Sequence, residues 1–553
     1  MTATLRIASC QLNPVVGDIW GNEAKINAGY ARAKSDGADI AVFPELMIIG
    51  YPPEDLVLRP TVVDDCRKAC VRLAEKTVDG PALLLTAPWH VDGKLYNAAI
   101  WMESGEIKHI RLKHHLPNYG VFDEARVFAK GPLPHPIDFK GVSIGLPICE
   151  DLWQPGVAEH LADNGAEIML SPNGSPWRRT AHAERTAALG EKVFNEGLPL
   201  VYVNQIGGQD ELVFDGSSWS MAVDGTIVQS LKSFVEDYDV ADWKKIDGKW
   251  TCVSAKTEAH LSGLEADWRA CCLGLGDYVK KNGFKQIVLG LSGGVDSAIC
   301  AAIAADALGP DRVWCVMMPS EYTSSDSLED AKLCAEQIGM RYDIIAIRPA
   351  RDAFTEMLDP LFEELEPDTT EENIQSRIRG LTLMALSNKF GPMLVTTGNK
   401  SEMAVGYATI YGDMSGGYNP IKDLYKTEVF ALCNWRNAHT PDDLLGGDAP
   451  IPQRIITKPP SAELRDDQKD SDSLPDYPVL DDILLGLIEQ ELPVEAIVAR
   501  GHSRDDVVRI QRLLYIAEYK RRQAPPGVKI GSKNFGRDRR YPITNRYRDR
   551  FDD

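Results

Sequence analysis

The feature that most constrains the fold is a glycine-rich turn between an apolar strand and a helix. Gln286–Leu291 is predicted to be a buried strand and Ala298–Ala307 a helix, with the run SGGVDS between them. Glycines let backbone N–H groups close around an anion, and a helix N-terminus adds the positive end of its dipole. The turn therefore predicts a phosphate-binding loop at a strand end, formed by Gly290, Leu291, Ser292, Gly293, Gly294, Val295, Asp296 and Ser297.

The alternation of strand and helix continues after this turn. A strand at Val313–Met318, a helix at Ser327–Ile338 and a strand at Asp343–Ile347 predict a doubly wound parallel sheet with helices on both faces. A polar stretch at residues 242–266 marks a domain junction. We therefore assign the second domain to residues 256–553.

Residues 1–255 have a different pattern, in which many strands pair as hairpins around a few helices, and we expect a mixed α/β sandwich. Helices are predicted at Asn22–Lys34 and Ala183–Asn195. The predicted strands are Leu5–Cys10, Asp39–Phe43, Pro81–Thr86, Tyr96–Trp101, Lys108–Leu112, Val142–Ile148, Glu167–Leu170 and Leu198–Asn204.

Composition narrows the functional classes. The net charge is −21, which disfavours binding to bulk nucleic acid, where Lys and Arg must displace counterions. The 11 cysteines include no C-x-x-C pair and indicate a reducing compartment. The N-terminus has no basic and apolar signal pattern, and no apolar run approaches the ~20 residues of a membrane span. We expect a cytoplasmic protein that binds neither membrane nor nucleic acid.

Three polar residues follow predicted strands in the first half. Glu45 comes just after Asp39–Phe43, Lys113 ends the strand at Lys108–Leu112, and Cys149 follows Val142–Ile148. Amide hydrolysis needs a nucleophile, a proton acceptor and a stabiliser of the oxyanion. Cys149 fits the first role and Glu45 the second, while Lys113 is expected to lower the thiol pKa and hold the tetrahedral intermediate.

This set resembles the nitrilase superfamily over nearly the whole first half. The resemblance implies that Glu124 is the additional glutamate that positions the substrate. In members fused to a synthetase it implies glutamine contacts at Tyr119 and Ser175. Those members usually carry a lysine at the position of Ala181, for which Arg178 and Arg179 are the candidate replacements.

The second half resembles the N-type ATP pyrophosphatases and, among them, the NAD synthetases. The resemblance rests on SGGVDS, on TTGNKSE at residues 396–402, on GYATIYGDMSGGYNPIKDLYK at residues 406–426 and on EYKRRQAPP at residues 518–526. It implies further ATP contacts at Thr397, Lys426 and Ser461, and magnesium ligands at Asp296 and Glu402. It also implies contacts to nicotinic acid adenine dinucleotide (deamido-NAD) at Asn373, Arg377, Glu402 and Lys520.

Two positions depart from the ammonia-dependent members of that family. Ile410 stands where they carry a lysine, and Tyr418 where they carry an acidic residue that contacts the substrate. The polar stretch at residues 458–477 is too long for a plain connection and is interpreted as a functional loop or a disordered insert.

Together the two resemblances imply amidation of deamido-NAD to NAD with ATP, Mg²⁺ and ammonia released from L-glutamine. They also imply an ammonia tunnel and a homo-oligomer, often an octamer. Alternatives are an amidotransferase acting on another carboxylate or on a purine carbonyl, a tRNA-thiolating enzyme, or a non-catalytic first domain that mediates assembly. The absence of a basic surface and of a redox-active cysteine pair disfavours the tRNA enzyme.

Overall fold

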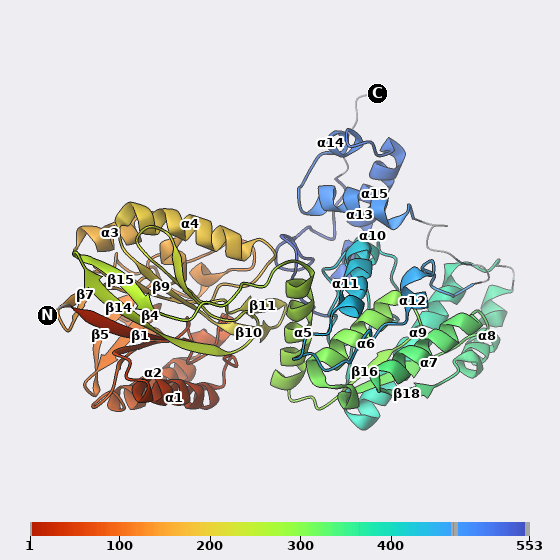
Figure 1. The fold of residues 1–553 in the computed structure, drawn as a ribbon. Coiled ribbons are helices and arrows are strands. Elements are labelled where there is room, and N and C mark those ends of the chain that lie inside the picture. Colours follow the sequence, from red (N-terminus) through yellow and green to blue (C-terminus); the bar gives the residue numbers. More distant parts are fainter. Residues whose placement is uncertain (1–2, 364, 466–467, 469–473, 548–553) are drawn as a thin grey trace. The chain divides into compact units, whose positions relative to one another are not determined.

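The computed structural model describes residues 3–363, 365–465, 468 and 474–547. The chain divides into two compact units, Met1–Leu261 and Ser262–Asp553. Figure 1 colours them from red to olive green and from green to blue respectively. No helix among the described residues is long and apolar enough to cross a membrane.

The first unit is built on two main sheets. The seven-stranded sheet has the order β15-β14-β1-β2-β3-β4-β5, and the six-stranded sheet β13-β12-β9-β8-β7-β6; β10 and β11 form a separate hairpin. The strands are β1 (Thr4–Gln11), β2 (Ile40–Val42), β3 (Ala82–Val91), β4 (Lys94–Glu103), β5 (Glu106–Leu112), β6 (Ile137–Phe139), β7 (Val142–Gly145), β8 (Ile168–Asn173), β9 (Leu200–Asn204), β10 (Ile206–Gln209), β11 (Leu212–Asp215), β12 (Trp219–Met221), β13 (Ile227–Ser230), β14 (Asp237–Ile246) and β15 (Lys249–Ser254).

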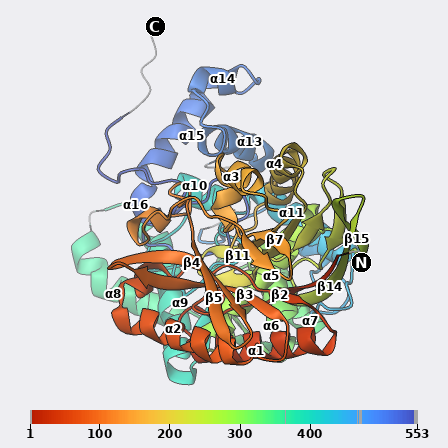
Figure 2. The same ribbon diagram turned by 90° about the vertical axis from the view of Figure 1, so that its left-hand side faces the viewer.

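Helices cover the outer faces of these sheets. α1 (Ile19–Ser35) and α2 (Pro60–Glu75) lie on the β1–β5 sheet, and α3 (Val157–Asp163) and α4 (Ala181–Glu196) on the sheet that contains β8 and β9 (Figures 1 and 2). Strand β1 shows the layering, because Leu5 and Ile7 face the core between the sheets whereas Ala8 and Cys10 face the helices. Both faces are therefore buried, which explains why these strands read as apolar runs.

The second unit contains a parallel sheet with the strand order β18-β17-β16-β19. Its strands are β16 (Ile287–Gly290), β17 (Val313–Met317), β18 (Arg341–Ile344) and β19 (Met393–Leu394). The helices around it are α5 (Gly263–Lys281), α6 (Val295–Leu308), α7 (Ser325–Ile338), α8 (Arg348–Phe362) and α9 (Thr369–Phe390). The strand predicted at Asp343–Ile347 lies earlier, since Ile347 already caps α8, which has Pro349 in its first turn.

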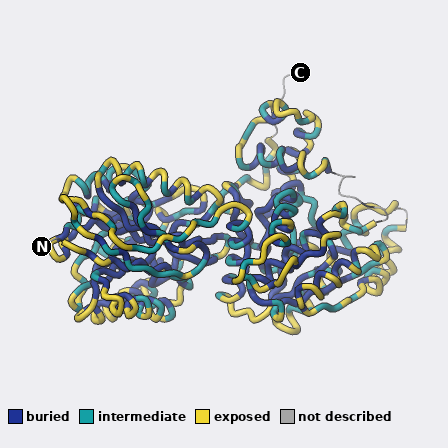
Figure 3. The backbone as a smooth tube through the Cα atoms, viewed as in Figure 1, coloured by how far each residue is buried: buried dark blue, intermediate teal, exposed yellow. Residues whose placement is uncertain are grey.

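A helical cluster follows the sheet along the chain and has its own apolar core. That core takes its helical residues from α10 (Lys400–Val405), α13 (Tyr477–Ile488), α14 (Val494–Val498) and α15 (Arg504–Ile516). Around it, α11 (Lys426–Ala438) packs against α5, α6 and α13, α12 (Gln453–Thr457) against α6 and α11, and α16 (Glu518–Arg521) against α10 and α15. In each unit the buried backbone follows the sheets and the inner helix faces, while exposed backbone follows the loops and the outer helix faces (Figure 3).

Candidate active sites

In the first unit, Glu45 and Lys113 meet at the ends of their strands. Lys113 Nζ lies 2.7 Å from Glu45 Oε1, and both side chains are fully buried. Cys149 is also buried, at the start of a short 3-10 helix, Cys149–Leu152. The charges of Glu45 and Lys113 both act on the Cys149 thiol. The structure thus brings together the three residues predicted from the sequence.

Both oxygens of Glu45 are held in place. Asn97 Nδ2 donates to Oε1 at 2.8 Å, and the backbone N–H of Gly174 donates to Oε2 at 3.0 Å. Asn97 lies on β4, and Gly174 directly follows β8. Sequence reasoning missed both contacts, because each joins segments that are far apart in the chain and carries no local motif. The two hydrogen bonds fix the orientation of the Glu45 carboxylate, as a proton acceptor at this position would require.

Glu124 contacts the lysine. Its two carboxylate oxygens lie 2.8 and 2.9 Å from Lys113 Nζ, and the Tyr51 hydroxyl donates to Oε1 at 2.8 Å. Burial lowers the pKa of Lys113, but Glu124 and Glu45 more than offset this, so that the net pKa is raised well above its usual value. Lys113 is therefore a permanent ammonium, suited to stabilising an oxyanion rather than to exchanging protons.

The backbone at Cys149 adopts a left-handed conformation, with φ 44°. Asp151 fixes this turn by accepting from the backbone N–H of Ile148 at 3.0 Å, and it also accepts from the backbone N–H groups of His114 and His115 at 3.0 and 2.7 Å. One buried carboxylate thereby joins the turn at Cys149 to the segment that follows Lys113. Such strain persists at functional sites when the surroundings fix the conformation.

The Cys149 thiol differs from the expected thiolate. Burial raises its pKa well above the usual value, Glu45 adds to the rise, and Lys113 only partly opposes it. The resting thiol is therefore neutral. Attack on an amide then requires transfer of its proton as the bond forms, which is the task of a neighbouring base such as Glu45.

Of the expected glutamine contacts, Tyr119 donates its hydroxyl to Glu150 at 3.0 Å and stays half exposed, whereas Ser175 is buried beside Gly174. Ala181 opens α4 and is buried. Arg178, a proposed replacement for the family's lysine, instead forms an ion pair with Glu184.

Glu124 gives the first unit a pH-dependent stability. Burial raises its pKa from 4.5 to about 7, against the opposing effect of Lys113. Between these values the folded state binds more protons than the unfolded state, so the free energy of unfolding should fall as the pH rises. The slope from this residue is steepest midway between the two values, at about 1.2 kcal/mol per pH unit.

Urea unfolding at pH values from 4.5 to 7 tests this assignment. Glu124→Gln should show a shallower loss of stability with rising pH than the unsubstituted chain. Asp151, whose pKa burial raises to about 6, titrates in both proteins and cancels in the difference. Identical slopes in the two proteins would contradict the assignment.

In the second unit, the glycine-rich turn lines a cavity of about 390 Å³. The predicted order of strand, turn and helix is present, but β16 ends at Gly290, before the predicted Leu291, and α6 begins at Val295, before the predicted Ala298. Within the turn, Ser297 Oγ donates to the carbonyl oxygen of Gly294 at 2.9 Å, and the Gly294 N–H donates to Ser292 Oγ at 3.2 Å. The serines thus hold the turn open at the helix N-terminus, where an anion binds favourably.

Asp296 and Glu402 face one common point. Lys426 Nζ contacts Asp296 Oδ2 and lies 3.1 Å from Glu402 Oε1, while Asn399 Nδ2 donates to Asp296 Oδ1 at 3.0 Å. The ammonium of Lys426 thus bridges the two carboxylates. Asp296, Glu402 and Lys426 all line the cavity. Mg²⁺ is commonly held by one or two carboxylates plus substrate phosphates, so this donor set fits that ion.

Thr397 and Ser461 also line the cavity. Ser461 belongs to the predicted loop 458–477, of which residues 466–467 and 469–473 lie outside the described part of the chain. Its first residues contact the cavity wall, where Glu463 Oε1 accepts from Ser324 and Ser327 at 2.7 and 2.8 Å. The segment 458–464 therefore forms part of the cavity wall.

Asn373, Arg377 and Lys520 gather around the loop 406–413. Asn373 Oδ1 accepts from the Thr409 hydroxyl at 2.8 Å, Arg377 Nε donates to the Ile410 carbonyl at 3.3 Å, and Lys520 Nζ donates to the Gly406 and Ala408 carbonyls at 2.8 and 2.7 Å. In this state they hold that loop. Arg379 was not predicted from the sequence as a site residue. It lines the cavity, and its Nε donates to the Met318 carbonyl.

The glycine-rich turn offers a matched pair of substitutions. Gly293 has φ +80°, and an added Cβ would lie 2.4 Å from the Ser327 carbonyl oxygen, whereas a Cβ on Gly294 would meet only Ser292 Oγ, at 3.3 Å. The left-handed backbone alone costs about 1–2 kcal/mol for a residue with a Cβ. A substituted turn would relax away from this shape, and ATP binding would then have to restore it at that cost. Gly293→Ala should weaken ATP binding about tenfold or more, since about 1.4 kcal/mol is tenfold.

Calorimetric titration of ATP into each variant measures this effect, with Gly294→Ala as the control. Equal losses of ATP affinity in the two variants would show that the shape of the turn is not the cause.

Comparison with known proteins identifies both units. Residues 6–244 match the carbon-nitrogen hydrolase family, and residues 267–524 match the NAD synthase family. Over 550 residues the chain is 49% identical to the glutamine-dependent NAD(+) synthetase of Rhodobacter capsulatus, covering 99% of this chain and 100% of that protein. The corresponding enzyme of Xanthomonas campestris is 47% identical, with 98% of each chain covered.

A solved structure supports the same assignment over both units. The glutamine-dependent NAD+ synthetase of Acinetobacter baumannii, determined in complex with adenosine diphosphate, matches with a TM-score of 0.78 and 40% identity, covering 98% of this chain and 99% of that one. The predicted nitrilase-like sandwich and the predicted synthetase sheet are confirmed. The chain belongs to the family of glutamine-dependent NAD(+) synthetases.

Proposed function

We propose that this protein converts deamido-NAD into NAD, using ATP and the side-chain amide of L-glutamine and releasing AMP and pyrophosphate. The single observation that carries the proposal is the presence in one chain of a Glu45–Lys113–Cys149 centre and a separate cavity that contains a phosphate-binding turn. We assign the glutaminase domain to residues 1–255 and the synthetase domain to residues 256–553.

In the glutaminase, Cys149 Sγ attacks the amide carbon of glutamine while Glu45 takes the thiol proton. Lys113 stabilises the oxyanion of the tetrahedral intermediate. The C–N bond then breaks, Glu45 returns the proton to the leaving nitrogen, and ammonia departs. A glutamyl thioester remains, and water activated by Glu45 hydrolyses it to glutamate. Glu124, Tyr119 and Ser175 complete the pocket as substrate-positioning residues.

In the synthetase, the nicotinate carboxylate attacks the α-phosphorus of ATP, and pyrophosphate leaves. Residues 290–297 form the turn at the ATP site, where N–H groups at the start of α6 and the ammonium of Lys426 stabilise the departing phosphates, while Thr397 and Ser461 hold the nucleotide. Bound Mg²⁺, held by Asp296 and Glu402, would supply positive charge against the phosphate oxygens. Ammonia then attacks the acyl carbon of the adenylate, AMP leaves, and loss of a proton gives the carboxamide.

Asn373, Arg377, Glu402 and Lys520 are our candidates for contacts to deamido-NAD. Three of them hold the loop 406–413 in this structure, so binding would rearrange that loop. We further propose a cytoplasmic homo-oligomer that passes ammonia internally, because ammonia released into water at neutral pH becomes ammonium and loses its nucleophilic electron pair.

Isotope transfer tests the overall reaction. With deamido-NAD, ATP and glutamine labelled with nitrogen-15 in its amide, mass spectrometry should find the label in NAD, together with stoichiometric AMP and pyrophosphate. Other carboxylates offered in place of deamido-NAD should give little AMP. Preferential use of another carboxylate would favour the alternative, a different glutamine-dependent ligase.

A further inference from the structure

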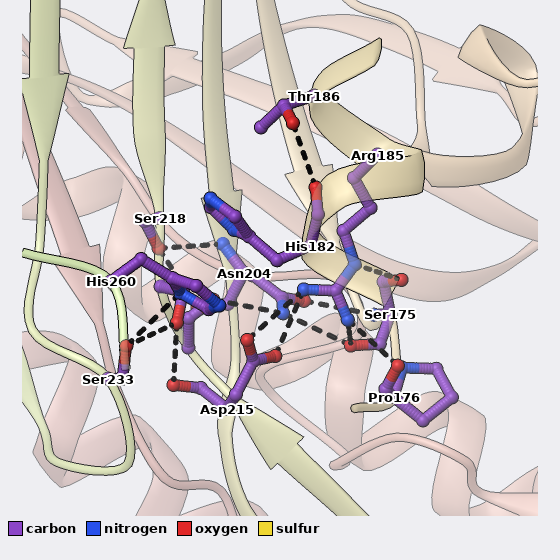
Figure 4. Close-up of polar contacts among 12 residues, drawn as sticks. Ser175, Pro176, His182, Arg185, Thr186, Asn204, Asp215, Ser218, Ser233 and His260 are labelled. Atoms are coloured by element: carbon purple, nitrogen blue, oxygen red, sulfur yellow. Dashed lines mark hydrogen bonds and ion pairs between the residues drawn. The ribbon is translucent and has the colours of Figure 1, made fainter. Parts of the chain in front are cut away.

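A buried arginine, Arg185, is hydrogen-bonded to Ser175, one of the proposed glutamine contacts. Arg185, on α4, is 1% exposed, and its partner Asp215, at the end of β11, is fully buried. Figure 4 shows the guanidinium reaching from the helix to Ser175 and Pro176 on one side and to Asp215 on the other. Sequence reasoning considered only Arg178 and Arg179 as cations for this region, and Arg185 has no role in the mechanism proposed above.

The three guanidinium nitrogens of Arg185 contact three residues. Nε donates to Ser175 Oγ at 3.1 Å, and Nη2 donates to the carbonyl oxygens of Ser175 and Pro176 at 3.0 and 2.8 Å. Nη1 lies 3.0 and 3.3 Å from the two oxygens of Asp215. A guanidinium has five N–H donors in a fixed planar fork. Arg185 therefore grips both the side chain and the backbone of Ser175.

Ser175 is bound from a second direction as well. Its backbone N–H donates to Asn204 Oδ1 at 2.9 Å, and its carbonyl accepts from Asn204 Nδ2 at 3.1 Å. The preceding residue, Gly174, donates its N–H to Glu45 Oε2. One short segment therefore carries the contact to the general base and, at the next residue, the Arg185 contacts. A shift of Ser175 would also move the donor that orients Glu45.

The charge of this arginine also acts on the nucleophile. Burial lowers the pKa of Arg185, but Asp215 more than offsets this, so the guanidinium stays charged. The positive charge of Arg185 and a thiolate at Cys149 stabilise each other. A buried ion pair is weak evidence for stability alone, because desolvation offsets much of its attraction. The contacts of Arg185 are instead made to Ser175 and Pro176, next to the Gly174 amide that binds Glu45.

We propose that Arg185, held by Asp215, is the positioning residue that fixes Ser175 and the Gly174 amide for glutamine binding and hydrolysis. This inference rests on the proposed glutaminase function. Because all three guanidinium nitrogens already contact protein groups, Arg185 acts through Ser175 and Gly174 and does not bind glutamine itself. Arg185 thereby provides a cation beside the proposed glutamine site, in a chain that has Ala181 where the family usually has a lysine.

Comparing NAD formation from glutamine with NAD formation from ammonium chloride distinguishes a positioning role of Arg185 from a general structural role. Arg185→Gln should lower kcat/KM for glutamine at least fiftyfold and raise the KM for glutamine, while NAD formation from ammonium chloride stays within twofold of the unsubstituted enzyme. Arg185→Lys keeps the positive charge but lacks the planar set of N–H donors, so its kcat/KM for glutamine should lie between those of Arg185→Gln and the unsubstituted enzyme. Asp215→Asn should change the glutamine kinetics in the same direction. Thr186→Ala, on the next residue of α4, is the matched control and should leave both rates unchanged.

Alkylation of Cys149 provides a readout that misfolding would not mimic. In Arg185→Gln, a glutamine-shaped electrophile, 6-diazo-5-oxonorleucine, should inactivate the glutamine route at least tenfold more slowly, whereas the rate with iodoacetamide should change much less. If Arg185→Gln does not fold, Arg185→Lys decides by the same comparison.

Unchanged glutamine kinetics in the folded variants, or an equal loss of the glutamine and ammonium routes, would overturn the inference. Failure of the unsubstituted enzyme to make NAD from glutamine would instead refute the proposed function itself.

Discussion

Cys149→Ala should abolish glutamine-supported NAD formation while ammonium still supports it. Without the thiol no thioester can form, and removing the nucleophile of such a centre costs roughly ten-thousand-fold or more in rate. Cys149 is buried among charged groups, and an alanine side chain fits within the space of the thiol. The measurement is the rate of NAD formation with glutamine and, separately, with ammonium chloride.

Cys252→Ala provides the control for this prediction, because Cys252 lies half-buried on the strand β15 of the same unit. It should keep both activities. If Cys149→Ala retained full glutamine activity, the nucleophile would lie elsewhere. If it lost the ammonium route as well, the substitution would have damaged the synthetase, and the separation of roles between the two units would be wrong.

Asp296→Asn should impair NAD formation from both nitrogen sources. The substitution keeps the size and the acceptor oxygen but removes the negative charge that faces Lys426 and the proposed magnesium position. Loss of one preorganised electrostatic group typically costs about a hundred- to a thousandfold in rate. Adenylate formation should fall by the same factor, which exchange of labelled pyrophosphate into ATP measures directly.

The control is Asp359→Asn on the exposed surface of α8, which should leave the exchange rate unchanged. Glutamine hydrolysis at Cys149 should continue in Asp296→Asn. A loss confined to the glutamine route would contradict a role for Asp296 in adenylate formation and would connect it with the glutaminase instead.

Local sequence predicted the positions where chemistry is placed. Glu45 and Lys113 follow strands β2 and β5 of the seven-stranded sheet, and Cys149 follows strand β7 of the six-stranded sheet. Functional side chains are common in the segments that follow strands, so each residue could be proposed from its type and position before its neighbours were known. The glycine-rich turn was predicted for the same reason, since its φ values and the following helix are local properties. Both predictions depend on short-range physics.

The partners of these residues could not be predicted in this way. Asn97, Tyr51 and Arg185 contact Glu45, Glu124 and Ser175 only after segments distant in the sequence have packed together. In the sequence, nothing distinguishes Arg185 from any other basic residue of a helix. The neutral state of Cys149 is likewise a product of burial by the whole unit. The strand at Arg341–Ile344 was misplaced because its apolar neighbours continue into the turn before α8.

The protonated thiol of the resting enzyme has a consequence for its chemical durability. Peroxides and other oxidants react with thiolates far faster than with thiols, and access to the sulfur limits them further. Cys149 combines a raised pKa with a side chain that is 4% exposed, so sulfenic acid formation is suppressed on both grounds. Under the proposed function, the sulfur loses its proton only as it attacks a bound amide, so its reactivity toward oxidants stays low between turnovers.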